Sequence, residues 1–194
     1  MTRFEHCYSA REAQELDTAD VYDVPAEKAP TSRQKLIEID PQNGPRWLAR
    51  CSGDYAGGLT GLYSCPNEHD LCVVIEGAAY ILHTATPGAA DDVEEYPTVH
   101  VLPCRADNLL ILGSFDTLTA YGPTGFVWQT ESFAHDGFAI HEVRGHELVG
   151  VAESPAFGAR EFRVDLRNGA HEGGTYWVSN GPRRRSRVWK RIRR

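Results

Sequence analysis

The most constraining feature of this chain is a regular alternation of short apolar runs with Gly, Pro, Asp and Asn turn residues between Cys72 and Leu166. Runs of this length and spacing are typical of antiparallel β-sheet, and they leave too little chain for the helical crossovers that parallel strands require. The clearest strand is 161–166, where apolar and charged residues alternate strictly. Alternation sends successive side chains to opposite faces of a strand. We therefore expect one set in the core and the other in water: Phe162, Val164 and Leu166 against Glu161, Arg163 and Asp165.

Turn residues delimit the other expected strands. Glu76-Gly77 predicts a hairpin, because glycine accepts a positive φ. Gly122–Gly125 predicts a second turn, in which Pro123 fixes φ. Residues 44–50 fit either a strand or a turn of helix. The expected strands are 36–39, 72–75, 79–82, 98–102, 109–112, 118–121, 126–129, 138–140 and 147–151. The fold class that follows is mainly β, an antiparallel meander arranged as a sandwich or an incomplete propeller-like sheet.

The N-terminal residues carry a different signal. Ser9 and Glu12 have the spacing of a capping box, which predicts a short helix from Ala10 to about Leu16. Residues 20–32 are acidic and contain proline, so we expect a surface linker. We accordingly divide the chain into an N-terminal arm and linker at 1–35, a β domain at 36–180 and a basic tail at 181–194.

Charge is distributed unevenly along the chain. The net charge is −7, and the last fourteen residues contribute +8 through seven Arg and one Lys, which leaves −15 on the rest. A body this acidic is poorly suited to bind nucleic acid on its own faces. No apolar run is long enough to span a bilayer, and the first residues lack the apolar stretch of a secretory signal, so we expect a cytoplasmic protein.

Cysteine and histidine residues provide the candidate metal ligands. Cys65, His69 and Cys72 are closely spaced, and Cys51 completes a possible four-ligand zinc site. The competing interpretation is that these cysteines are reduced and packed in the core, because the chain has five cysteines and lacks the Cys-x-x-Cys pair of most zinc sites. A second candidate is the hairpin that carries His141 and His146. We expect no cofactor, with zinc as the alternative.

One segment resembles a known family. The run from Leu109 to Asp116, followed by Thr117 to Trp128, has an apolar strand, Gly-Ser, a short turn, a strand ending in Ala-Tyr, a Thr-Gly turn and then Trp. It resembles one blade of a quinoprotein-type (PQQ-like) β-propeller, and residues 137–169 echo it more weakly. The chain also resembles single-domain bacterial proteins with this Trp and turn pattern. The resemblance implies a local four-stranded meander. It implies no quinone, because no cofactor-binding positions match.

Function is expected to lie where residues depart from the strand pattern, above all in the tail. Clustered guanidinium groups bind phosphates or carboxylates, and a tryptophan among them can stack or anchor. The sequence has no nucleophile elbow, P-loop or dinucleotide motif, so an enzyme is the less favoured class. We expect a non-enzymatic module that binds a protein partner or a second copy through sheet loops and the tail. The alternatives are nucleic-acid binding through the tail and a metal-dependent enzyme or zinc-stabilised fold. The tail residues concerned are Arg183, Arg184, Arg185, Arg187, Trp189, Lys190, Arg191, Arg193 and Arg194.

Overall fold

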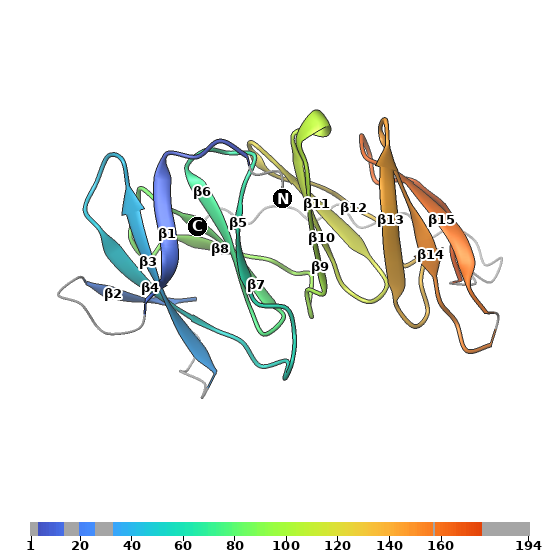
Figure 1. The fold of residues 1–194 in the computed structure, drawn as a ribbon, viewed down its shortest axis with the longest axis horizontal. Coiled ribbons are helices and arrows are strands. Elements are labelled where there is room, and N and C mark those ends of the chain that lie inside the picture. The colour runs from blue at the N-terminus through green and yellow to red at the C-terminus, as the bar shows by residue number, and fades with distance from the viewer. Residues whose placement is uncertain (1–3, 14–19, 26–32, 157, 176–194) are drawn as a thin grey trace, which may run out of the picture.

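The computed structural model describes residues 4–13, 20–25, 33–156 and 158–175. The mainly β fold predicted from the sequence is confirmed. Four four-stranded sheets follow one another in chain order, side by side, without closing into a barrel (Figure 1). A sandwich would have two sheets. Within the described residues the helical structure is limited to one short 3-10 element, η1 (Arg105–Asp107).

Residues 10–13, with which the predicted N-terminal helix begins, lie instead in a strand of the first sheet, so that prediction is wrong; residues 14–16 lie outside the described residues. Tyr8 to Ala13 form a strand that pairs antiparallel along its whole length with residues 36–41. The strand places Tyr8 and Ala10 against the second sheet, and Arg11 on the opposite face beside Glu38. A short helix is marginal in water, and this burial outweighs the local capping signal. The strand order is β1-β3-β4-β2, with β2 parallel to β4, and the bounds are β1 Tyr8–Ala13, β2 Val21–Val24, β3 Gln34–Pro41 and β4 Trp47–Ser52.

The other three sheets are simple antiparallel meanders, and they confirm the strands predicted from Cys72 onward. The Glu76-Gly77 turn has positive φ at both residues, as a tight hairpin requires. Of residues 44–50, for which the sequence left strand and helix open, 47–50 belong to strand β4. The second sheet has β5 Gly61–Ser64, β6 Asp70–Ile75, β7 Ala78–His83 and β8 Ala90–Asp92. The third has β9 His100–Cys104, β10 Leu109–Gly113, β11 Leu118–Gly122 and β12 Gly125–Gln129. The fourth has β13 Phe138–Arg144, β14 Glu147–Ala152, β15 Arg160–Asp165 and β16 His171–Gly173.

Three apolar clusters fill the spaces between successive sheets. In β6, Leu71 and Val73 face the first sheet, whereas Cys72 and Val74 face the third. In β10, Leu110 faces the second sheet, while Leu109 and Ile111 face the fourth. Both strands are therefore buried on two faces and read as continuous apolar runs. Each fully buried aliphatic side chain contributes about 1.5–3 kcal/mol relative to an exposed one.

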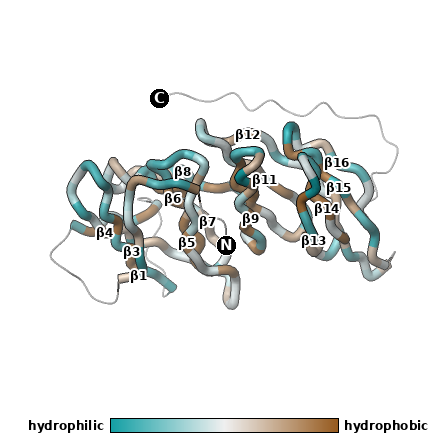
Figure 2. The backbone as a smooth tube through the Cα atoms, turned by 45° about the horizontal axis from the view of Figure 1, so that its top comes forward, coloured by the Kyte–Doolittle hydropathy of each residue, from teal (hydrophilic) through white to brown (hydrophobic). Residues whose placement is uncertain are grey.

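The outward faces of the two terminal sheets are charged instead. On the first sheet, Arg11 pairs with Glu38 at 3.0 Å and Arg50 with Asp23 at 2.8 Å. On the fourth, Glu161 and Arg163 are exposed while Phe162 is buried, as the alternation predicted. Figure 2 shows the hydrophobic colour concentrated along the inner strands. Among the described residues, the three apolar clusters lie only at the three interfaces between consecutive sheets.

Two tryptophans connect neighbouring sheets in the same way. The Trp47 indole N–H donates to the carbonyl of Thr84 at 2.9 Å, and that of Trp128 donates to the carbonyl of Leu166 at 2.8 Å. Each acceptor is the first residue after the third strand of the next sheet. Near the acceptor of Trp128, Gly169 lies in the turn after Leu166 and has a φ of +74°. A Cβ atom at this position would lie 2.7 Å from the Trp128 ring. Glycine is therefore required at that position so that the indole can approach the turn.

We expect Trp128→Phe to lower the free energy of unfolding by about 1–3 kcal/mol, because it leaves the buried Leu166 carbonyl without its donor. Urea denaturation monitored by circular dichroism measures the change. Phe126→Ser is the control, because Phe126 is 62% exposed on the same strand and its replacement should change stability by only about 0.5 kcal/mol. Equal losses in the two variants would contradict this role for the indole.

Candidate functional site

The four residues of the expected zinc site lie at three separate places. Cys51 is buried between the first and second sheets, and Cys65 and Cys72 are buried between the second and third. Burial raises the pKa of both Cys51 and Cys72 to about 12. His69 is on the loop before β6, where its Nδ1 lies 2.7 Å from the Sγ of Cys7. Within the described ranges, no group of three or more His, Cys, Asp or Glu side chains is placed to hold a metal ion.

The two other candidates from the sequence have different outcomes. His146 lies in the β13–β14 turn of the fourth sheet, and its Nδ1 contacts the carboxylate of Asp107 in η1 of the third sheet. This contact connects the two sheets. His141 lies on β13 and is exposed, so the structure does not bring the two histidines into one site. The basic tail at 181–194 lies outside the described residues.

The loops emerge at two opposite ends of the sheets, which we call the cleft end and the aromatic end. The cleft end has the β5–β6 loop at 65–69, η1 and the β11–β12 turn. The aromatic end has the β4–β5 loop at 53–60, the β8–β9 loop at 93–99 and the β10–β11 turn at 114–117. The two ends are the upper and lower edges of the sheets in Figure 1.

Three exposed aromatic residues define the aromatic surface: Tyr55, Tyr96 and Phe115, which are 39%, 50% and 43% exposed. The rings of Tyr55 and Phe115 meet edge to face, with centroids 6.1 Å apart. The Tyr96 hydroxyl donates to the Asp54 carboxylate at 2.5 Å, and this hydrogen bond raises the pKa of the tyrosine. The aromatic surface thus combines apolar area with a fixed carboxylate.

A hollow of about 300 Å³ adjoins the aromatic surface between the third and fourth sheets. Phe115 borders both features, and the carboxylates of Asp136 and Glu153 line the hollow. His100 also lines the hollow, with its ring stacked on that of Phe138 at 4.7 Å between centroids and its Nε2 3.1 Å from the Phe138 carbonyl oxygen. Burial lowers the pKa of His100, so its neutral form is favoured. The lining of the hollow therefore combines aromatic rings with two acidic residues.

A buried carboxyl group supports the aromatic surface from below. Glu95 is only 2% exposed, although it directly precedes Tyr96. Its Oε1 accepts the Ser114 backbone N–H at 3.1 Å and the Thr117 hydroxyl, and its Oε2 accepts the Gln129 amide at 3.2 Å and the Thr119 hydroxyl. Donors from the β10–β11 turn, from β11 and from β12 thus hold the loop of Tyr96 to the turn of Phe115. This network fixes the relative positions of the two aromatic residues.

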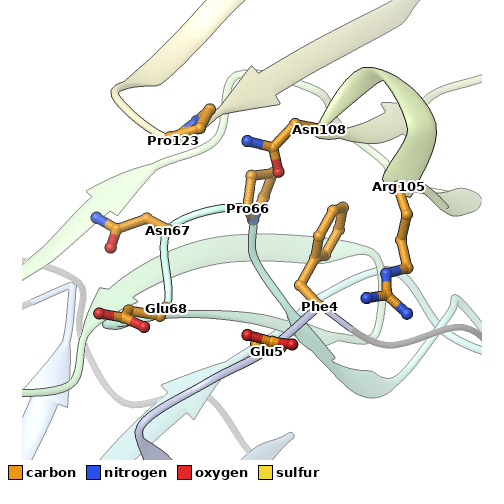
Figure 3. A pocket seen from close by; sticks show the side chains of 8 residues that line it. All are labelled: Phe4, Glu5, Pro66, Asn67, Glu68, Arg105, Asn108 and Pro123. Carbon is orange, nitrogen blue, oxygen red and sulfur yellow. The ribbon is translucent and has the colours of Figure 1, made fainter.

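The cleft end contains a larger depression, the cleft, at the interface of the second and third sheets. Its volume is about 460 Å³. At the two interfaces compared above, a tryptophan donates to the residue that directly follows the third strand of a sheet, Thr84 or Leu166. In the third sheet the corresponding residue is Pro123. No tryptophan of the described part of the chain docks there. In Figure 3 the Phe4 ring lies between Pro66 and Arg105, and the lining residues are Phe4, Glu5, Pro66, Asn67, Glu68, Arg105, Asn108 and Pro123.

No protein-family model and no curated protein matches this chain. Among the described residues, no helix is both long and apolar enough to cross a membrane.

Sequence reasoning missed the residues that define the aromatic end, and of the Cys7–His69 pair at the cleft end it named only His69, as a zinc ligand. Glu95 belongs to an acidic run, and nothing in its neighbourhood distinguishes it from the exposed carboxylates beside it. Tyr55, Tyr96 and Phe115 come from three loops, so no local motif includes them together. Cys7 and His69 are separated by 62 positions. The sequence distinguishes these residues only by their position outside the segments with alternating apolar and polar residues.

We expect Glu95→Gln to destabilise the protein by about 1–3 kcal/mol, because an amide NH₂ would replace an oxygen that faces hydrogen-bond donors. Urea denaturation measures this loss. Glu94→Gln is the matched control, since Glu94 is exposed and should be nearly neutral. A Glu95→Gln protein as stable as the control would show that the network does not stabilise the loops.

We also expect stability to fall as the pH decreases through about 6.5. Burial lowers the pKa of His100 and of His171 in the folded protein, so the unfolded chain binds more protons in this range and gains stability relative to the fold. His100→Gln removes one of the two contributions. The free energy of unfolding at pH 5.5 and 7.5 should therefore differ less in this variant than in the wild type, and an unchanged difference would refute the assignment.

Proposed function

We propose that this chain is a non-enzymatic, cytosolic protein-binding module whose main contact area is the aromatic surface. The observation that carries the proposal is the group of three exposed aromatic residues on neighbouring loops. Exposed apolar clusters in soluble proteins commonly mark interaction sites, and tyrosine is enriched among the residues that contribute most to binding. The adjoining hollow offers a pocket into which a partner side chain fits.

The proposal extends to the arrangement of the sheets. We propose that the four sheets are successive blades of an open propeller-like array. Face-to-face packing in chain order and the repeated tryptophan docking support it, and four-stranded blades are the repeating units of propellers. The blade-like segment at 109–128 forms β10, β11 and β12, with Trp128 docked on the following sheet.

The chemistry of the aromatic end favours a partner with basic side chains. Asp54, Asp136 and Glu153 border the exposed rings, and a cation that approaches an aromatic face gains additional stabilisation. The loops that carry Tyr96 and Phe115 are joined through Glu95, so little ordering is needed when a partner binds. We propose the tail at 181–194 as a second contact for an acidic region of a partner. The sequence-based alternative, nucleic-acid binding through the tail, is tested separately below.

Replacing Tyr55, Tyr96 and Phe115 together with Ser is expected to weaken partner binding at least about tenfold, because hot-spot residues contribute roughly 2 kcal/mol or more each. The intact chain and the triple variant are used as bait in the native cytosol, and a partner retained by the intact chain is then titrated against both proteins. Phe126→Ser is the matched control, as a similarly exposed aromatic residue outside the aromatic surface. A partner that binds the triple variant as tightly as the intact chain would contradict the proposal.

A truncated chain that ends at residue 180 separates the tail from the aromatic surface. If the tail binds a polyanion, the truncation abolishes salt-dependent binding to nucleic acid while partner binding through the aromatic surface remains. Unchanged nucleic-acid binding by the truncated chain would eliminate the tail alternative.

A further inference from the structure

The cleft end contains a thiol and an imidazole in direct contact. Cys7 Sγ lies 2.7 Å from His69 Nδ1 and 3.3 Å from the Glu68 carbonyl oxygen. The other ring nitrogen of His69, Nε2, is 3.6 Å from the Glu68 carboxylate. A nucleophile within reach of a base is the central part of an activated nucleophile, and here a carboxylate also lies near the other nitrogen of the base.

Cys7 differs from every other cysteine of the chain. It is partly exposed, whereas Cys51, Cys65, Cys72 and Cys104 are all buried. Burial raises the pKa of those thiols, to about 12 for Cys51 and Cys72 and to about 11 for Cys104. The thiolate is the reactive form, and the buried thiols are both protonated and inaccessible at neutral pH. Chemistry at sulfur is therefore directed to Cys7.

The cleft beside Cys7 offers complementary charges to a small zwitterion. Glu5 and Glu68, which flank Cys7 and His69 in the sequence, place carboxylates in the cleft. Arg105 enters the cleft from η1 beside Phe4 and forms no ion pair with another described residue (Figure 3). An ammonium group fits the two carboxylates, and a carboxylate fits the guanidinium.

We propose that Cys7 and His69 form a thiol–disulfide exchange site for low-molecular-weight disulfides derived from amino acids, which the adjacent cleft binds through their charged groups. The thiol proton moves to His69 Nδ1, and the thiolate attacks one sulfur of the disulfide. A new S–S bond forms to Cys7 as the original S–S bond breaks, and the departing thiolate takes the proton from the imidazolium. The Glu68 carboxylate stabilises the imidazolium between these two transfers. The product is a mixed disulfide at Cys7, with its adduct in the cleft. This site is independent of the aromatic surface, which lies at the opposite end.

The test measures modification of the full chain by cystine, by oxidised glutathione and by the uncharged hydroxyethyl disulfide. Intact mass spectrometry gives the rate, and peptide mapping gives the site. We expect one adduct, on Cys7, and none in Cys7→Ser. His69→Gln should slow exchange with all three reagents about tenfold or more at pH 7, as loss of a positioned base does. Thermal unfolding of each variant establishes that it is folded.

Two further measurements distinguish activation from mere exposure. The ionisable groups around the pair are Glu5, His6 and Tyr8 of its own segment, Glu68 and Asp70 around His69, and Arg105 across the cleft. His69→Gln should react more slowly than the wild type at every pH tested, because the positioned base is absent. Arg105→Gln should lower the rate at which Cys7 reacts with cystine and with oxidised glutathione. It should leave the rate with hydroxyethyl disulfide unchanged, because that reagent carries no charge.

Three results would overturn the proposal. They are modification of a cysteine other than Cys7, equal rates for the wild type and a folded His69→Gln variant across the pH range, and an equal effect of Arg105→Gln on charged and uncharged reagents. The first two results would show that Cys7 is not activated by His69, and the third would show that the cleft does not recognise the charged groups of the disulfide.

Discussion

The structure depends on the burial of its inner sheets on both faces. The second and third sheets contact a neighbour on each side, so β6 and β10 have no solvent-facing positions, and their alternate side chains belong to different apolar clusters. A polar residue on these strands is desolvated and therefore needs a partner, as Asp70 at the start of β6 has in Asn67 and His83. The terminal sheets have one face each in water, and their outward ion pairs are the expected result. The order of the four sheets in the array therefore follows the apolar character of their faces.

This stacking also determines where chemistry is available. When the broad faces of the inner sheets are covered, the loops at the two ends remain as the accessible irregular surface, which is where binding residues commonly lie. The two ends differ in construction. At the aromatic end, the carboxyl group of Glu95 joins a loop to a neighbouring turn and holds exposed rings in place. At the cleft end, the interface of the second and third sheets has no docked tryptophan among the described residues, and the cleft occupies that position.

Local sequence patterns predicted the strands because their causes are local. The Glu76-Gly77 hairpin follows from backbone freedom at two residues, and β15 follows from the strict alternation around Phe162 and Val164. The pattern failed at Ser9–Glu12, where a correct helix-capping spacing was overridden by strand pairing with β3. Trp128 lies on a strand, as the sequence predicted, but its acceptor, the carbonyl of Leu166, lies 38 positions away. No local signal specifies that pair.

By itself, the sequence determined a mainly β fold with short antiparallel strands, an acidic body and a basic tail, because periodicity, turn residues and charge are properties of neighbouring residues. The tertiary structure decided which side chains meet. It placed Cys51 and Cys72 on opposite sides of one sheet and brought Cys7 to His69 instead. It also buried Glu95 while leaving Tyr96 exposed. These outcomes depend on which sheet faces which, and the free energy of that choice comes from apolar contacts between segments far apart in the chain.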